Sequence, residues 1–372
     1  MRYNFDKVID RSGTSAEKVE GLKHIWGRTD LIPLWVADMD FATAPFVTDA
    51  IRKRCENEVL GYTGKPDSYY NAIINWVKQR YDLVVAKEMI NFVPGIVPGI
   101  GMAMNCFTQK GDKVMIQPPV YHPFAWVTTR NERTLVTNPL KWENGMYRMD
   151  LDTFREQIKG CKLFILCNPH NPGGVVWTEA ELRAIADICY DEKVLVFSDE
   201  IHADLTLPPH THRPFATVSE KARMNSVTFM SPSKAFNMPG LSASHALIFN
   251  EDLRKRFRIY MDAGELDMGH VFAFLSVEAA YSHGTEWLDQ CLAYIQGNID
   301  FVDDFLKNHA PKIKAIRPGA SYLVWLDCRE LKLSQKDLNE FFVDKAHLAL
   351  NDGEMFGKEG IGFMRLNVAS PR

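Results

Sequence analysis

A lysine stands just beyond an apolar stretch in the segment SVTFMSPSKAFNMPGL, residues 226–241. Lys234 follows Ser231 by three positions, although lysine is costly to bury and flexible when exposed. Ser-x-x-Lys occurs in two chemistries: a serine nucleophile beside a lysine, and a lysine whose amine forms an imine with a cofactor aldehyde. A solvated lysine at the end of a strand is a third interpretation, and this segment alone does not choose among them.

Three apolar stretches end in polar groups that are not typical of a protein core. KLFILC leads to Asn168, VLVFS leads to Asp199, and SVTFM leads to Ser231. Ligands in open α/β sheets bind beyond the carboxyl ends of the strands. We therefore expect the three strand ends to converge on one site.

Pyridoxal phosphate needs groups of the kind found at these ends: an amine for its aldehyde, an anion for its ring nitrogen and a donor for its ring oxygen. Lys234 would supply the amine, Asp199 the anion and Asn171 the donor. A charge pair at contact distance contributes on the order of 4 kcal/mol at an effective dielectric constant of ~20. The three residues together predict a site for pyridoxal phosphate.

The cofactor's phosphate and ring faces also need partners. The segment FVPGIVPGIGMAMNCF, residues 92–107, places glycines before a helical pattern, so backbone amides at a helix start could bind an anion. The segment fits neither the Gly-x-Gly-x-x-Gly pattern nor the P-loop, which disfavours a dinucleotide fold and a P-loop fold. Tyr121 follows another strand and could stack on a ring, with an ordinary surface aromatic as the alternative.

Continuous apolar stretches alternate with amphipathic helical patterns through the middle of the chain. Unbroken apolar stretches are typical of strands buried on both faces. The predicted strands comprise residues 113–117, 162–167, 194–198 and 226–230. Residues 178–193 predict a helix that opens with Thr178 and Glu181 as a capping box. The alternation indicates an α/β domain with a mostly parallel central sheet.

The C-terminal part has longer helical patterns. Helices are predicted at residues 251–262, 271–283, 285–308 and 334–346, with strands at 321–327 and in the last apolar segment, IGFMRLNVA. A chain of 372 residues favours two domains. We expect a large domain at residues 46–280 and a smaller, discontinuous α+β domain at residues 1–45 and 281–372.

The composition excludes several classes of protein. The chain is 46% hydrophobic and 24% charged, and its net charge of −4 favours neither nucleic acid nor a membrane surface as a partner. The first residues lack the apolar core of a signal peptide, and no apolar stretch is long enough to span a bilayer. The seven cysteines form no Cys-x-x-Cys pair, and Cys106, Cys161, Cys167 and Cys189 are predicted to be core residues. These features predict a protein of a reducing cytoplasm.

Two competing interpretations of the same residues are weaker. The β-lactamase-like chemistry of Ser231 and Lys234 also needs Ser-Asp-Asn and Lys-Thr-Gly elements, and neither occurs in the chain. A metal site is suggested by acids and histidines clustered within residues 199–212, but these lack a fixed helical spacing and mix ligand types.

The chain resembles fold-type I pyridoxal-phosphate enzymes of the class I/II aminotransferase superfamily, and within it the MalY/PatB-type cystathionine β-lyases. Matching stretches lie in order along almost the whole sequence. They are PLWVADMDF (33–41), LGYTGKPDSYYNAI (60–73), IQPPVYHPF (116–124), NPHNPGGVVWT (168–178), SDEIHADL (198–205), SPSKAFNMPGL (231–241) and MRLNVASPR (364–372).

This resemblance implies a role for each residue around the cofactor ring. Lys234 would be the Schiff-base lysine and catalytic base, and Asp199 the partner of the ring nitrogen. Asn171 would contact the ring oxygen and the substrate carboxylate, while His202 would lie near that oxygen. Tyr121 would stack on the ring.

The resemblance also implies partners for the cofactor phosphate and the substrate. The implied phosphate ligands are Gly95, Ile96, Val97, Ser231 and Ser233. Arg365 would hold the substrate α-carboxylate in two parallel hydrogen bonds. Tyr62 would be a catalytic and cofactor-binding residue that reaches into the neighbouring subunit's site, which implies a homodimer.

Two departures from the family pattern stand out. Many aminotransferases carry a phosphate-binding arginine eight residues after the lysine, where this chain has Ser242. The phosphate must then depend more on backbone amides, serines and Tyr62. Relatives also usually continue beyond the position of Arg372 into a last helix.

The expected activity is that of a cytoplasmic pyridoxal-phosphate-dependent C–S β-lyase. It would cleave L-cystathionine or related cysteine S-conjugates to a thiol, pyruvate and ammonia. An aminotransferase using the same site is the first alternative, because the residues alone do not separate the two reactions. A regulatory binding protein on the same fold is the second.

Overall fold

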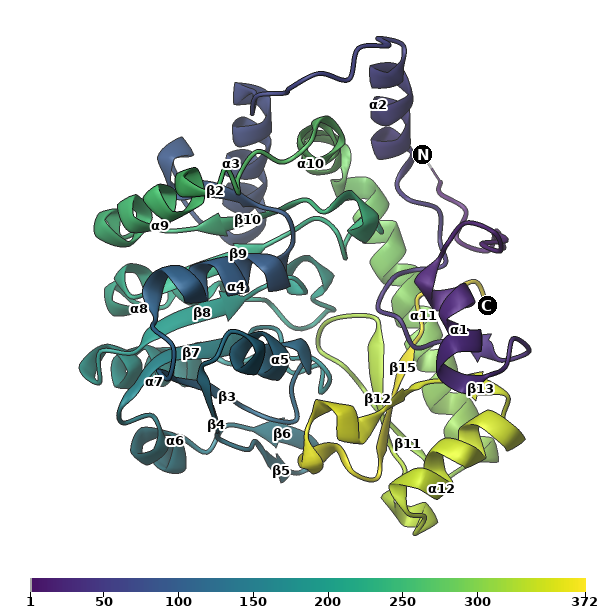
Figure 1. Cartoon of the computed structure of the whole chain (residues 1–372). Coiled ribbons are helices and arrows are strands. Elements are labelled where there is room, and N and C mark those ends of the chain that lie inside the picture. Colours follow the sequence, from purple (N-terminus) through teal and green to yellow (C-terminus); the bar gives the residue numbers. More distant parts are fainter. Residues whose placement is uncertain (1) are drawn as a thin grey trace.

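A seven-stranded mixed sheet forms the centre of the molecule in the computed structural model, which describes residues 2–372 (Figure 1). In spatial order its strands are β2 (Ile90–Val93), β10 (Ser244–Leu247), β9 (Ser226–Met230), β8 (Leu195–Asp199), β7 (Cys161–Cys167), β3 (Lys113–Ile116) and β4 (Thr134–Thr137). From β9 to β4 all neighbours run parallel, while β10 is antiparallel to both β9 and β2. The predicted α/β class with a mostly parallel sheet is confirmed.

Two apolar cores lie against the opposite faces of this sheet. Along β7, Leu163 and Ile165 belong to one core, whereas Phe164 and Leu166 belong to the other. This alternation follows from the two-residue period of a strand, and it explains why the sequence of a doubly covered strand is apolar at every position. All five residues of β9 are buried.

Helices pack around the main sheet, and several of them connect its parallel strands. They are α3 (Asp67–Tyr81), α4 (Ile96–Phe107), α5 (Pro123–Arg130), α6 (Leu151–Gln157), α7 (Glu179–Asp191), α8 (Glu220–Met224) and α9 (Glu251–Ala263). The predicted capping box of α7 is present: Glu181 N donates to Thr178 Oγ1 at 3.2 Å, and Thr178 N donates to Glu181 Oε2 at 2.8 Å. Figure 1 shows α4 and α5 on the near face of the sheet.

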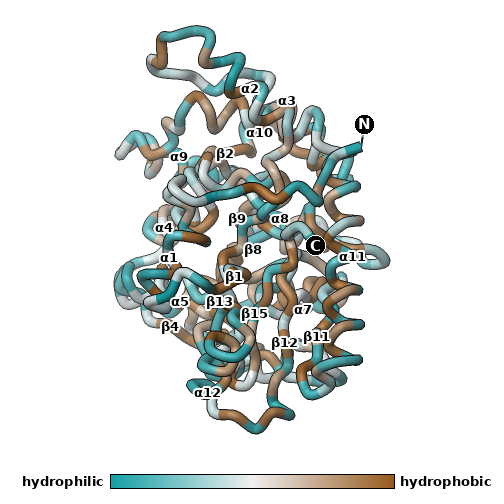
Figure 2. The backbone as a smooth tube through the Cα atoms, turned by 90° about the vertical axis from the view of Figure 1, so that its right-hand side faces the viewer, coloured by the Kyte–Doolittle hydropathy of each residue, from teal (hydrophilic) through white to brown (hydrophobic). Residues whose placement is uncertain are grey.

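A second, four-stranded antiparallel sheet lies beside the first. Its order is β11 (Lys314–Ile316), β12 (Leu323–Asp327), β15 (Phe363–Asn367) and β14 (Asn351–Asp352). The helices α1 (Glu17–Trp26), α2 (Pro45–Cys55), α10 (Val271–His283), α11 (Thr285–His309) and α12 (Gln335–Glu340) complete the fold. Two small pairs remain: β1 (Ile32–Pro33) runs parallel to β13 (Leu348–Ala349), and β5 (Lys141–Glu143) runs antiparallel to β6 (Met146–Arg148). Figure 2 shows the hydrophobic stretches along inner strands such as β9 and β12.

The predicted C-terminal elements are confirmed with small differences at their ends. The strand predicted from residue 321 begins at Leu323, because Ser321 has a φ of 82°, outside the range of a strand. The helix predicted to residue 346 ends as α12 at Glu340 and continues as one π-helical turn, Phe341–Lys345.

We propose the division into domains at residues 46–280 and at residues 1–45 with 281–372. The pairing of β1 with β13 supports it, because it ties the N-terminal segment to the C-terminal part. The proposed boundary lies within α10, and the two parts share the largest core cluster, which contains Phe274 of one part and Leu366 of the other.

None of the helices within residues 2–372 is both long and apolar enough to cross a membrane.

Candidate active site

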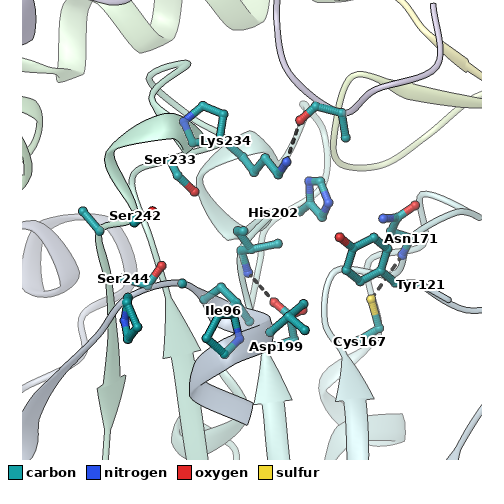
Figure 3. A pocket seen from close by; sticks show the side chains of 18 residues that line it. Ile96, Tyr121, Cys167, Asn171, Asp199, His202, Ser233, Lys234, Ser242 and Ser244 are labelled. Carbon is teal, nitrogen blue, oxygen red and sulfur yellow. Dashed lines mark hydrogen bonds between the residues drawn. The ribbon is translucent and has the colours of Figure 1, made fainter. Parts of the chain in front are cut away.

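A cavity of about 210 Å³ opens at the carboxyl ends of β7 and β8 (Figure 3). Parallel strands end at the same edge of a sheet, so residues distant in sequence meet there. The lining includes Gly95, Ile96, Val97, Tyr121, Cys167, Asn171, Asp199, His202, Ser233, Lys234, Ser242 and Ser244. The expected convergence of the three strand ends is therefore present in the fold.

Lys234 lies in the turn that follows β9 and is largely buried. Its Nζ donates a hydrogen bond of 2.6 Å to the carbonyl oxygen of Ala37. Burial, reinforced by the positive charge of Arg365, lowers the pKa of Lys234 to about 8. At that pKa roughly a quarter of the amines are neutral at pH 7.5, against roughly one in a thousand for an ordinary lysine. The amine is therefore available as a nucleophile and as a proton acceptor near neutral pH.

Asp199 is the last residue of β8 and lies at the bottom of the cavity. One carboxylate oxygen accepts a hydrogen bond of 3.0 Å from Ile201 N. Burial raises the pKa of Asp199 to about 7, against the opposing effects of that hydrogen bond and of Lys234. A cation bound beside it would favour the carboxylate form. Asp199 is thus suited to accept a positively charged partner in the cavity.

His202 lies three residues beyond Asp199, between Lys234 and Tyr121 in Figure 3. Its Nδ1 is buried without a hydrogen-bond partner among residues 2–372. Burial lowers the pKa of His202 to about 3, so the ring is neutral at physiological pH. A neutral imidazole can donate or accept one hydrogen bond toward a ligand.

Arg365 and Asn171 meet beside the cavity although they are 194 positions apart in sequence. Arg365, on β15, donates from Nη1 to Asn171 Oδ1 at 3.1 Å and from Nη2 to Trp35 O at 3.2 Å. The guanidinium also donates to Asn351 Oδ1, but its buried Nε has no partner in the described part of the chain. Burial lowers the pKa of Arg365 to about 10, so the group keeps its charge at neutral pH.

The opposite end of the cavity is suited to an anion. Gly95, with a φ of 146°, is the N-cap of α4, and the first residues of that helix line the cavity. Amides at a helix start have no partner within the helix and carry partial positive charge. Ser233, Ser242 and Ser244 complete this end in Figure 3.

Three residues expected at the site do not line this cavity: Arg365, which lies beside it against Asn171, Tyr62 and Ser231. Tyr62 is 98% exposed on the segment between α2 and α3. Ser231 lies one layer behind, where its hydroxyl is 2.7 Å from Ala243 O and 2.9 Å from Ser233 Oγ. Among the described residues no group of three or more His, Cys, Asp or Glu side chains is arranged to hold a metal ion.

Some lining residues were not predicted from the sequence as part of the site. Ala37 contributes a backbone carbonyl, and Cys167, expected as a core residue, is buried but also lines the cavity. The Cys167 sulfur accepts a hydrogen bond of 3.3 Å from Asn171 N. Cys167 directly precedes Asn168 at the end of a strand, and this position could have indicated that it belongs to the site. The residue type of Ala37 gives no indication that its backbone carbonyl is an acceptor.

The fold and the site define a class of enzyme. The chain matches the family Aminotransferase class I and II over residues 29–372, and it belongs to this family. Its fold is that of the pyridoxal-phosphate-dependent enzymes, since it superposes on cystalysin from Treponema denticola, whose structure contains that cofactor, with a TM-score of 0.96. That pair is 34% identical over 100% of this chain and 95% of the other.

More particular likenesses point to one branch of the family. The chain is 39% identical to the cystathionine β-lyase PatB of Bacillus subtilis over 98% of this chain and 95% of the relative. It is 36% identical to the pyridoxal-phosphate-bound C–S lyase of Staphylococcus hominis, with a TM-score of 0.91, over 100% of this chain and 95% of the other.

The residues of the cavity fit this cofactor. A buried amine with a lowered pKa, an acid at the bottom and a helix start with three serines correspond to the aldehyde, ring nitrogen and phosphate. The unpartnered Nδ1 of His202 and Nε of Arg365 are polar atoms that a bound molecule can satisfy. The cavity therefore offers a partner to each of these three groups of pyridoxal phosphate.

Proposed function

We propose that this protein is a pyridoxal-phosphate-dependent C–S β-lyase that cleaves L-cystathionine or related cysteine S-conjugates to a thiol, pyruvate and ammonia. The observation that carries the proposal is the single cavity lined by Lys234, Asp199 and the start of α4, with Arg365 bound to Asn171 at its edge. The likeness to PatB and to the S. hominis C–S lyase supports the lyase reaction within the family.

The residues around the cofactor ring have separate tasks in this proposal. Lys234 attaches the cofactor covalently and, once free, accepts the α-proton of the substrate at Nζ. Asp199 pairs with the ring nitrogen, while Asn171 and His202 contact the ring oxygen. Tyr121 covers the ring face, and burial raises the pKa of its hydroxyl, so it stays neutral.

The remaining residues orient the two ends of the complex. The amides of Gly95, Ile96 and Val97 bind the phosphate together with Ser233, and Ser231 supports Ser233 from behind. Arg365 holds the substrate α-carboxylate in a fork, with Asn171 alongside. When bound, pyridoxal phosphate supplies an electron sink for the pair left at the α-carbon, and those electrons then expel a thiolate from the β-carbon.

The deciding experiment is incubation with L-cystathionine or L-cystine in the absence of any oxo acid. We expect sustained release of pyruvate, ammonia and thiol in equal amounts, because β-elimination needs water but no second amino acceptor. Each product is assayed separately over many turnovers. Turnover that requires an added oxo acid and produces a new amino acid would replace the lyase with the aminotransferase alternative. Cofactor-loaded protein that turns over neither substrate set would favour the regulatory alternative.

We also propose a homodimer in which Tyr62 enters the partner's active site. The observation in favour is the exposure of Val59, Leu60 and Tyr62 on one segment, since exposed apolar groups gathered together are typical of an interface. We expect a sedimentation mass near twice 42.4 kDa for the wild type. A monomeric, fully active enzyme would contradict this part. The seven unpaired thiols are consistent with the proposed cytoplasmic location.

A further inference from the structure

Residues 35–41, here called the strap, pass beside Lys234 without forming a helix or strand. Backbone carbonyls in such a segment need partners from elsewhere when they are shielded from water. In the strap these partners are side chains from β15 and from the turn that follows β9. Arg365 donates to Trp35 O, Asn367 to Val36 O and Asp38 O, and Asn237 to Met39 O and Phe41 O.

The carbonyl of Ala37 is the part of the strap that faces the lysine. It accepts one hydrogen bond of 2.6 Å from Lys234 Nζ and a second of 2.9 Å from the hydroxyl of Tyr322. A carbonyl oxygen has two lone pairs, so both are used. Tyr322 directly precedes β12 and is fully buried.

This acceptor is held in place from both sides. Asn367 Nδ2 donates to the carbonyls that flank Ala37, those of Val36 and Asp38, each at 2.6 Å. Asn237, three residues after Lys234, ties the strap to the lysine's own turn: it accepts from Met39 N at 3.0 Å and donates to Phe41 O at 2.7 Å. The strap and the lysine turn are therefore joined by hydrogen bonds through Asn237.

The proposed reaction requires Lys234 to alternate between two bonding states. Displacement of Lys234 by a neutral substrate amine would exchange one C=N double bond for another: the bond to Nζ would be lost, a bond to the substrate nitrogen would form, and both hydrogens of that amine would pass to Nζ. Nζ then leaves as a neutral amine with two N–H groups and one lone pair. In a buried cavity this flexible side chain needs a fixed acceptor if the lone pair is to remain directed at the substrate.

We propose that Tyr322 is a positioning residue that holds the Ala37 carbonyl as the docking point for the free amine of Lys234. This inference rests on the proposed function and deepens it. While Lys234 is attached to the cofactor, the Tyr322 hydroxyl still donates to the Ala37 oxygen. This oxygen therefore keeps a hydrogen-bond partner and its position between turnovers. Burial raises the pKa of Tyr322 well above its ordinary value, so the hydroxyl remains a donor across the physiological range.

The test is Tyr322→Phe, which removes the hydroxyl but keeps the ring in the core. Two rates report on the amine. One is exchange of the α-hydrogen of L-alanine in D₂O, followed by NMR, which measures proton transfer without a leaving group. The other is uptake of pyridoxal phosphate by cofactor-free protein above pH 8. We expect exchange and kcat to fall about tenfold and uptake to slow several-fold, with KM changed less than about twofold because Arg365 is untouched.

Tyr69→Phe is the matched control, since Tyr69 is also fully buried but its hydroxyl has no hydrogen-bond partner among residues 2–372. It should behave as wild type. Asn367→Ala, which loosens the same strap, should slow the same two rates and decides the matter if Tyr322→Phe does not fold. Rates for Tyr322→Phe equal to those for Tyr69→Phe, or a rise in KM that matches the fall in kcat, would overturn the inference. A wild-type protein that takes up no pyridoxal phosphate would instead overturn the proposed function.

Discussion

Replacing Lys234 with alanine should lower kcat for β-elimination by at least ~10⁴-fold while the protein stays folded. The loss is large because one amine performs two tasks, covalent attachment of the cofactor and acceptance of the α-proton. The fold should survive, since within residues 2–372 the one hydrogen bond that the Lys234 side chain makes is to Ala37 O, which still accepts from Tyr322. Borohydride reduction followed by peptide mass analysis should find the cofactor on the peptide containing Lys234 in the wild type, and on no peptide in the variant.

Lys336→Ala is a suitable control, because the Lys336 side chain is 83% exposed and does not line the cavity. It should match the wild type in colour, cofactor content and rate. A Lys234→Ala enzyme that retains a tenth of wild-type activity would exclude this lysine as the nucleophile. A colourless wild-type protein that does not bind pyridoxal phosphate would refute the cofactor assignment itself.

Replacing Asp199 with alanine should have the second-largest effect, a fall in kcat/KM of about 10³-fold, equivalent to ~4 kcal/mol of transition-state stabilisation. Asp199 is buried at the bottom of the cavity, where its carboxylate would face the protonated ring nitrogen. Removing one partner of a buried charge pair leaves the other uncompensated, so the ring would lose its proton and with it much of its capacity to accept electrons. Covalent attachment to Lys234 should persist, which separates this variant from Lys234→Ala.

Asp204→Asn provides the comparison for loss of a buried acid elsewhere. Asp204 is also buried, but it does not line the cavity. Its carboxylate accepts hydrogen bonds from Trp76 Nε1 and Tyr81 Oη. We expect lower thermal stability and a rate within about threefold of wild type. Near-normal turnover in Asp199→Ala would show that this carboxylate does not face the ring.

Much of the fold was predictable because its signals are local. The central strands were located from continuous apolar stretches, which the physics of a doubly covered sheet requires. The start of α7 was predicted from Thr178 and Glu181, whose capping box depends on residues only three positions apart. Where tertiary structure adds a constraint, the prediction erred by a few residues: β12 starts after Ser321, whose positive φ belongs to the turn before the strand.

The sequence alone was sufficient to predict that Lys234, Asp199 and Asn171 lie together, because each stands at or just beyond the end of a strand of the same sheet, and parallel strands end at a common edge. Only the tertiary structure decided the partners of these residues. Arg365 reaches Asn171 from the second sheet, and Lys234 finds its acceptor in the strap near the N-terminus. The physical reason is that the strap contributes backbone carbonyls, which are chemically the same at every residue. Their position in space, and not the type of residue that carries them, makes Ala37 part of the site.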